Sequence, residues 1–485
     1  MLPTQTRNRR DPVRPATEAR PVVPRRAVAL AVAAALASPA AVQAAQWEFT
    51  PRVALAQIWT DNVDLADRGL EESEWITELR PGFTLGIDGP RAKAKLDYDL
   101  QALWFADNSD FNDTYHQLNG SGNFLLLPGT LFLDTSARYD QQNISPGGRI
   151  SYSNYFETDN RTDAVVFAAS PYYTGRWGWA DSMVRYQYQG VRYTNTDDTT
   201  FGVQDSNTNS ISASLGTPAP ARGFTWQASG SYSRTEFDTA REFEYGRVEL
   251  ELGMPVGLRT RVTASGGLES DVAEDPSLGG LEASFWYLGF QWDPNELESL
   301  SVRVGDRYYG TAVEASYSRR GSRGEFGLQY TEEPTTSAGL QNDPTVFRPD
   351  LRPGGITGLD TRVFLQKRFS ANASYGFVRS RLSARLYSDR RDFDGAGEQE
   401  KAHGATLRYD WDFAARTTLY GSVDYEQRKF GTDRSDDYTE LSAGLTRELT
   451  RRVSASLAYS HFQRDSDAGE EYRVNQVSLR FNATF

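Results

Sequence analysis

The sequence of 485 residues contains no cysteine, only three methionines and only three histidines. Without cysteine the chain can form no disulfide framework, thiolate nucleophile or zinc ribbon. After residue 45 it also lacks any run of ~20 consecutive apolar residues, the length that a membrane-spanning helix needs. The formal charge of −13 argues against nucleic acid as a partner, because phosphate binding needs clustered Lys and Arg.

The first 44 residues have the features of a secretory signal. Arg25 and Arg26 precede an apolar run over residues 27–37, and small residues at 42–44 provide a cleavage site. This order of charged, apolar and small residues is typical of a signal peptide. We therefore expect residues 1–44 to be removed during export and residues 45–485 to form the mature protein.

From Trp47 onward, apolar residues recur at every second position. This period is typical of β-strands with one apolar and one polar face. The segments are about eleven residues long or longer, and eleven residues at ~3.3 Å each and a tilt near ~40° rise about 28 Å, enough to cross the ~25 Å apolar band of an outer-membrane barrel. The pattern predicts strands near 47–59, 75–87, 92–104, 116–127, 130–141, 163–175, 179–194, 206–217, 223–235, 245–255, 259–269, 281–292, 299–309, 310–319, 323–332, 361–370, 380–389, 402–413, 417–427, 436–449, 452–462 and 472–485.

The connections between these segments alternate between tight turns and longer polar loops. Short periplasmic turns and longer outer loops are typical of outer-membrane barrels. The sequence thus predicts an all-β fold: a single transmembrane antiparallel up-and-down β-barrel of about 22 strands, within a range of 18 to 24, in the cell outer membrane. The longest outer loop is expected at about 333–360.

The polar face of the strands should line the lumen of this barrel. Candidate lining residues of both charge signs occupy alternate positions: Arg91, Lys93, Lys95, Asp97, Asp99, Arg247, Glu249, Glu251, Arg261, Arg303, Arg381 and Arg385. Such a lumen would hold water and admit a polar solute, or it would be blocked by a network of ion pairs. The insert at 333–360 is the best candidate for a segment that folds inward as a constriction, and a solvated outer loop is the alternative.

The last residues alternate strictly and end in an aromatic residue, with Phe481 and Phe485 on the apolar face. They resemble the C-terminal signature that the barrel-assembly machinery recognises. Aromatic residues also gather near the strand ends, where they would form girdles at the two membrane interfaces. The expected partners are therefore this machinery during insertion, and outer-membrane lipid and lipopolysaccharide afterwards.

No catalytic, metal or cofactor site is expected. His116, His403 and His461 share the parity of apolar neighbours and should point outward at the interface, where a structural role is expected. Carboxylates such as Asp392 and Asp394 fall in outer loops, where they are solvated or bridge divalent ions to lipopolysaccharide. No calcium loop, phosphate-binding glycine loop or dinucleotide fingerprint is present.

Three short motifs carry a resemblance to a known family: Thr60-Asp61-Asn62, Pro81-Gly82-Phe83 and Tyr98-Asp99-Leu100-Gln101. They resemble the outer-membrane β-barrels associated with PEP-CTERM/exosortase systems, which are similar in style to the barrel porins of exopolysaccharide loci. The resemblance implies an outer-membrane location near exopolysaccharide production and surface-protein sorting, and it supplies no catalytic residues. No plug-sized domain precedes Trp47, which disfavours a TonB-dependent receptor.

Three functional hypotheses follow. The leading one is a non-enzymatic, porin-like channel for a polar solute or exopolysaccharide. The alternative is a structural or assembly barrel whose outer loops bind surface polysaccharide or proteins. The third, an outer-membrane hydrolase, requires one of the three histidines to lie within reach of a Ser or a carboxylate.

Overall fold

The structure is a computed structural model, and it describes residues 45–485 apart from residue 152 and the segments 195–202, 219–222, 239–241, 271–281, 342–358, 360, 394–397, 432–433 and 470. The expected signal peptide at 1–44 lies outside the described residues, as does Asp394. Most of the insert at 333–360 also lies outside them.

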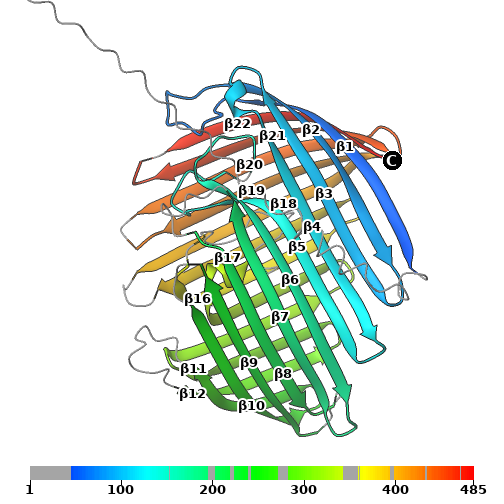
Figure 1. Cartoon of the computed structure of the whole chain (residues 1–485), viewed down its shortest axis with the longest axis vertical. Coiled ribbons are helices and arrows are strands. Elements are labelled where there is room, and N and C mark those ends of the chain that lie inside the picture. Colours follow the sequence, from blue (N-terminus) through cyan, green and yellow to red (C-terminus); the bar gives the residue numbers. More distant parts are fainter. Residues whose placement is uncertain are drawn as a thin grey trace, which may run out of the picture.

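Twenty-two strands form one closed antiparallel sheet (Figure 1). The strands are β1 (Gln46–Thr60), β2 (Glu74–Asp88), β3 (Ala92–Phe105), β4 (Asp113–Leu127), β5 (Leu131–Asn143), β6 (Arg161–Arg176), β7 (Asp181–Thr194), β8 (Ser206–Gly216), β9 (Thr225–Phe237), β10 (Phe243–Gly257), β11 (Thr260–Ser270), β12 (Glu282–Asn295), β13 (Glu298–Arg307), β14 (Gly310–Arg320), β15 (Gly324–Thr336), β16 (Val363–Gly376), β17 (Ser380–Phe393), β18 (Gln399–Ala414), β19 (Thr417–Lys429), β20 (Ser435–Glu448), β21 (Val453–Ser466) and β22 (Tyr472–Thr484). The two described helical segments are a 3₁₀ turn, η1 (Ser109–Phe111), and α3 (Ser337–Leu340).

Pairing between the first and the last strand closes the barrel. β1 pairs antiparallel with β22, from Arg52 opposite Thr484 to Thr60 opposite Gln476. Closure removes both sheet edges, so that every strand has two hydrogen-bonded neighbours, as a β-structure in lipid requires. The predicted fold class and the central estimate of 22 strands are confirmed.

The outer face of the barrel carries an exposed apolar surface. On β12, for example, Trp286, Leu288 and Phe290 are 52%, 58% and 44% exposed, whereas Phe285 and Tyr287, which alternate with them, face inward and are buried. A surface this apolar would be unstable in water, and it is accounted for by contact with lipid tails. In the described part of the chain, no helix is long and apolar enough to cross a membrane.

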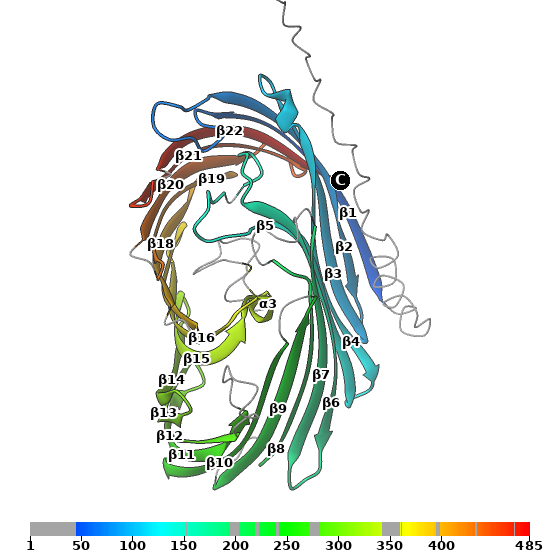
Figure 2. The same cartoon turned by 60° about the vertical axis from the view of Figure 1, so that its left-hand side comes forward.

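The two ends of the barrel differ in their connections. At one end the strands are joined by tight turns, such as residues 89–91 between β2 and β3 and residues 415–416 between β18 and β19. At the other end most connections are longer, although two residues join β13 to β14. Residues 144–160 between β5 and β6, and α3 after β15, run inside the barrel (Figure 2). We refer to these as the turn side and the loop side.

Candidate functional site: the lumen and its inward-folded segments

The predicted lumen residues lie on the face of the sheet opposite to the exposed apolar side chains. Eleven of the twelve are in strands, and Arg91 is in the turn before β3. Their spacing of two residues keeps them on one face, as the pattern of residues 93, 95, 97 and 99 on β3 illustrates. That a solute has access to this inner face stays a prediction.

One group of predicted residues forms an ion-pair cluster on β1 to β3. Arg52 on β1 lies 2.9 Å from the carboxylate of Asp99 and 3.4 Å from that of Asp97, and it donates to the hydroxyl of Thr84. Lys95 lies 2.8 Å from Asp97. The side chains of Arg52, Asp97 and Asp99 are between 23% and 29% exposed, so that the cluster remains in contact with solvent.

A second group is centred on Arg303 of β13. Its guanidinium lies 3.0 Å from Glu249, 3.5 Å from Glu251 and 2.5 Å from Glu314. Arg247 also pairs with Glu249, at 2.8 Å. Three carboxylates surround one guanidinium, so this arginine is the positive centre that keeps neighbouring carboxylates together on one wall.

The remaining predicted residues lie outside these two clusters. Arg261 donates to the hydroxyl of Thr225, and Arg385 lies over the ring of Tyr387 at 5.8 Å. Lys93 is 75% exposed and lies 3.9 Å from Asp88. Arg381 borders an open hollow of about 500 Å³ at the turn side, together with Arg320 and Arg323.

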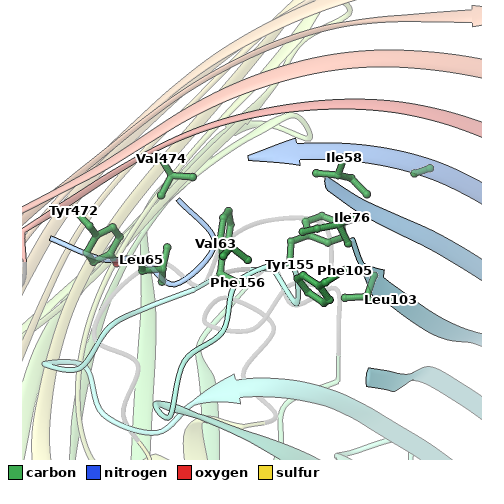
Figure 3. Close-up of a cluster of buried hydrophobic side chains, with 11 residues drawn as sticks. Ile58, Val63, Leu65, Ile76, Leu103, Phe105, Tyr155, Phe156, Tyr472 and Val474 are labelled. Atoms are coloured by element: carbon green, nitrogen blue, oxygen red, sulfur yellow. The ribbon is translucent and has the colours of Figure 1, made fainter. Parts of the chain in front are cut away.

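The loop-side end of the inner wall is apolar, contrary to the expectation of a polar inner face throughout. Ile58, Ile76 and Leu103 on β1 to β3 face inward and are at most 1% exposed. They pack with residues of two connections, among them Val63 of the β1–β2 connection and Phe156 of the β5–β6 connection (Figure 3). The full cluster is Ala56, Ile58, Val63, Leu65, Ile76, Leu103, Phe105, Tyr155, Phe156, Tyr472 and Val474. We call it the mouth cluster.

The β5–β6 connection runs inside the barrel past β1 to β4 and reaches β21 and β22. Arg464 of β21 donates to the backbone carbonyls of Gly148 and Gly147, at 2.9 and 3.0 Å. Tyr472 of β22 donates to the carbonyl of Ile150 at 2.9 Å. Asn160 closes the base of the loop, because its side-chain oxygen accepts from the backbone N–H of Ser145 at 2.7 Å. We call residues 144–160 the crossing loop.

Buried polar groups hold the crossing loop in place. The side chains of Arg464 and Asp436 are both 0% exposed and lie 2.9 Å apart. On the other flank, Tyr155 donates to the carboxylate of Glu78 and accepts from Arg480 at 2.6 Å. Burial, reinforced by the neighbouring Glu78, raises the pKa of Tyr155 to about 12, so that the phenol stays protonated and remains a donor.

The described part of the insert 333–360 also lies inside the barrel. Gln341 exchanges hydrogen bonds with Gln142 of β5 at 2.9 and 3.0 Å, and Gln189 of β7 donates to the carbonyl of Ala338 at 2.9 Å. Leu340 packs against Phe364 and Phe393 of β16 and β17. Of the two alternatives for this insert, the inward course therefore holds for residues 337–341.

Residues 395–485 match a family model described as "Putative beta-barrel porin 2". The match agrees with the structure, which is a closed barrel with an exposed apolar outer face and a charged inner wall. The protein is an outer-membrane β-barrel, and its C-terminal part is porin-like. No protein of curated function has a sequence that matches it significantly.

Several solved outer-membrane receptors are similar to this chain. It is similar to the siderophore receptor PirA from Acinetobacter baumannii, with a TM-score of 0.50 and 10% identity over 90% of this chain and 80% of that chain. PirA from Pseudomonas aeruginosa gives a TM-score of 0.44 and 14% identity over the same shares of the two chains. The ferric enterobactin receptor PfeA from P. aeruginosa gives 0.47 and 10% identity, over 91% and 82%.

The three histidines of the porin-like barrel lie on separate strands, β4, β18 and β21. His116 Nδ1 forms a hydrogen bond of 2.8 Å with the hydroxyl of Tyr98, and His461 Nδ1 forms one of 2.9 Å with Asn475. Among the described residues no hydrogen bond joins any of the three to a Ser or a carboxylate, and the Ser nearest in register is Ser388, opposite His403 in the β17–β18 ladder. Within the same part of the chain, no group of three or more His, Cys, Asp or Glu is arranged to hold a metal ion.

Sequence reasoning missed the mouth cluster and the arginines that hold the crossing loop. A signal for the cluster was present, because Ile58, Ile76 and Phe105 each stand next to an outward tryptophan, so that both faces are apolar there. No such signal identifies Arg464, whose partners Gly147 and Gly148 belong to a distant connection. A cavity of about 270 Å³ remains between the crossing loop and β20 to β22, bordered by Ile150, Glu440 and Ser460 among others.

Proposed function

We propose that this porin-like barrel is a non-enzymatic channel that lets a polar solute, such as exopolysaccharide or its fragments, cross the outer membrane. The observation that carries the proposal is the part of the inner wall that the inward segments leave uncovered, where partly exposed side chains of both signs line a closed barrel. Charged groups in contact with water favour a hydrated path, whereas a solid apolar core would exclude a polar solute.

The inward segments give the proposed channel its selectivity. The crossing loop and residues 337–341 occupy the loop half of the lumen, so a solute has to pass beside them or displace them. Inward segments that narrow a barrel exclude large solutes and leave passage to those that fit the remaining gap. The link to PEP-CTERM and exopolysaccharide systems is part of the proposal and is supported by the short motifs in the first three strands.

Conductance in planar bilayers tests the channel. The comparison is between the intact protein and a variant in which residues 337–361 are replaced by a short Gly/Ser linker. We expect the intact barrel to show small, defined conductance steps and the variant to show larger ones. The control shortens residues 467–471, a loop-side connection outside the described contacts of the crossing loop and the insert, and should leave the step size unchanged.

Absence of conductance in both the intact protein and the 337–361 variant would overturn the channel. The alternative, a structural or assembly barrel, would then be favoured if loss of the outer loops removed polysaccharide from the cell surface. Genes next to that of this protein supply an independent check on the exopolysaccharide link, because a channel for a polymer should accompany enzymes that make it.

A further inference from the structure

Four basic side chains from four neighbouring strands stand side by side on the outer face of the barrel. The register places Lys367 of β16 opposite Arg390 of β17, Arg390 opposite Lys401 of β18, and Lys401 opposite Lys429 of β19. They share the parity of exposed apolar residues such as Leu407, which is 49% exposed. Like charges directly opposite one another destabilise a sheet, so this row needs a counter-charge. We call these four residues the outer cation row.

The inner face of the same strands shows what a compensated row looks like. At the positions next to the outer cation row, on the inner face, Arg368 is opposite Asp389, and Arg428 is opposite Asp436. Arg368 and Asp389 form an ion pair at 2.8 Å with both side chains nearly inaccessible to solvent. On the inner face, a positive side chain is paired with a negative one on the neighbouring strand. On the outer face, all four neighbouring side chains are positive.

Acidic neighbours satisfy only part of the outer cation row. Arg390 pairs with Asp392 at 2.8 Å. Glu332, opposite Lys367 at the end of the row, accepts a hydrogen bond from Tyr330 instead. Lys401 and Lys429 form no hydrogen bond or ion pair with any residue that the structure describes. Two adjacent ammonium groups are therefore left for a ligand from outside the chain.

The height of the row matches the headgroup region of the outer leaflet. On β18, Lys401 lies about ten residues towards the loop side from the outward-facing Trp411 of the turn-side girdle, which at ~3.3 Å per residue and ~40° tilt is a rise of about 25 Å. Neighbouring strands are ~4.8 Å apart, so the four charges extend over roughly 14 Å. Long basic side chains at such a position reach up to the interface while their stems stay on the apolar surface.

We propose that the outer cation row binds the phosphate groups of the phosphorylated glycolipid in the outer leaflet, with Lys401 and Lys429 as its main contacts. The ligand is held on the outside of the barrel, so this inference is independent of whether the lumen conducts. Clusters of Lys and Arg next to an apolar surface attract anionic headgroups, each contributing a favourable electrostatic interaction.

Binding of lipid A to the detergent-solubilised, full-length barrel tests the proposal. The probes are lipid A with two phosphates, the same lipid without phosphate, and inorganic phosphate. We expect the Lys401→Gln/Lys429→Gln variant to bind lipid A roughly 30-fold more weakly than the intact protein. The Lys401→Arg/Lys429→Arg variant keeps the charge and should bind as the intact protein does.

The matched control is Arg234→Gln/Arg473→Gln. It removes two exposed loop-side cations outside the row, and Arg234 is surrounded by Glu236, Glu242 and Glu244. Its affinity for lipid A should be unchanged. Equal losses in the two glutamine variants, full binding by Lys401→Gln/Lys429→Gln, or equal affinity for the phosphate-free lipid would overturn the proposal. Displacement of the lipid by inorganic phosphate at a comparable concentration would also overturn the proposal, because the site would then bind a free ion.

Electrophoretic mobility of unheated samples reports whether each variant is a folded barrel. A lysine variant that fails to fold is replaced by the single substitution Lys429→Gln, for which a smaller loss of affinity is expected. Planar-bilayer conductance is measured in parallel. Loss of lipid binding with normal conductance, or the reverse, separates this inference from the proposed channel.

Discussion

The two halves of the lumen are built from the same strands but are stabilised in different ways. At the turn side, charges such as Arg52 and Asp99 remain 26% and 23% exposed and pair across neighbouring strands. At the loop side, Arg464 and Asp436 are fully inaccessible, because the crossing loop lies over them. An ion pair of the first kind contributes little to stability, whereas breaking one of the second kind is costly.

The comparison shows that the inner wall of a wide barrel does not form a hydrophobic core without a further segment packed against it. A barrel of this strand number is too wide for side chains of opposite walls to meet, so inner-face residues stay wet unless another segment covers them. Val63 and Phe156 from two connections cover Ile58, Ile76 and Leu103, and burial of these side chains then stabilises the loops. The four experiments below test this difference between the halves, from the largest expected effect on stability to the smallest.

The largest effect is expected for Arg464→Ala. The substitution removes one of the two arginines that pair with the buried Asp436 and leaves the carbonyl of Gly148 without its donor, whereas Arg434 still pairs with Asp436 and donates to Gly147. We expect a cost of about 3–4 kcal/mol. Amide hydrogen exchange of residues 145–160 should then become faster by roughly two orders of magnitude or more. The control is Arg408→Ala at the turn side, whose pair with Asp410 is 42% and 32% exposed and should contribute less than about 1 kcal/mol. Equal effects of the two variants would contradict the distinction between the halves.

A truncation of one aromatic ring in each half is the next test. Phe156→Ala removes a ring from the mouth cluster and should destabilise the docked crossing loop by about 3 kcal/mol, because a cavity remains in a packed core. Phe132→Ala at the turn side removes only a stacking contact with Tyr172, at 4.9 Å, and should cost about 1 kcal/mol. Limited proteolysis within the crossing loop measures the first effect, and unfolding in urea compares both. A larger loss for Phe132→Ala would show that the turn half is the packed one.

Lowering the pH should stabilise the docked state of the crossing loop. Burial and the nearby Glu72 raise the pKa of Asp64, and burial raises that of Glu157 in spite of the opposing charge of Arg161. A carboxyl whose pKa is raised on folding favours the docked state below its unfolded pKa, near 3.8 for Asp and 4.5 for Glu, and this contribution is lost as pH rises through the folded value. Proteolysis of the crossing loop should therefore be slower at pH 5 than at pH 7.5. The Asp64→Asn/Glu157→Gln variant should show a weaker dependence, and an unchanged one would exclude these groups as its origin.

The smallest effect on stability is expected for Arg303→Gln, in the middle of β13. The side chains of Arg303, Glu249 and Glu314 are 23%, 11% and 27% exposed and keep some contact with solvent, so unfolding should change by about 1 kcal/mol. The uncompensated carboxylates should instead shift the reversal potential of the channel towards cation selectivity. Lys93→Gln, whose ammonium is 75% exposed and only distantly paired, serves as the control and should give a smaller shift. No shift for Arg303→Gln would indicate that ions do not pass along this wall.

Regular alternation made the strands predictable. Each of the 22 expected segments coincides with an observed strand, because a lipid-facing residue at every second position leaves one acceptable register. The charged positions of β10 and β13 were predictable for the same reason. Their pairing was not, since Glu249 and Arg303 are separated by two strands in the sheet and only the curvature of the wall brings them together.

The paths of the connections could not be predicted. The insert after β15 was a reasonable inward candidate because of its length, but nothing in residues 144–160 indicates a segment that reaches β21 and β22. Asn160, Gly147 and Gly148 are ordinary turn residues in sequence. Asn160 acts within the loop through Ser145, whereas Gly147 and Gly148 accept from a guanidinium more than 300 positions away along the chain.

Sequence alone determined the closed antiparallel barrel, the number and position of its strands and which face meets lipid, because a period of two acts locally and the bilayer leaves no other solution for such strands. Tertiary structure decided that the loop half of the lumen is filled, that Arg464 and Asp436 are buried together, and that four cations line up on the outer face. These features depend on register between strands and on loops that cross the lumen, and both are set by contacts between residues far apart in the chain.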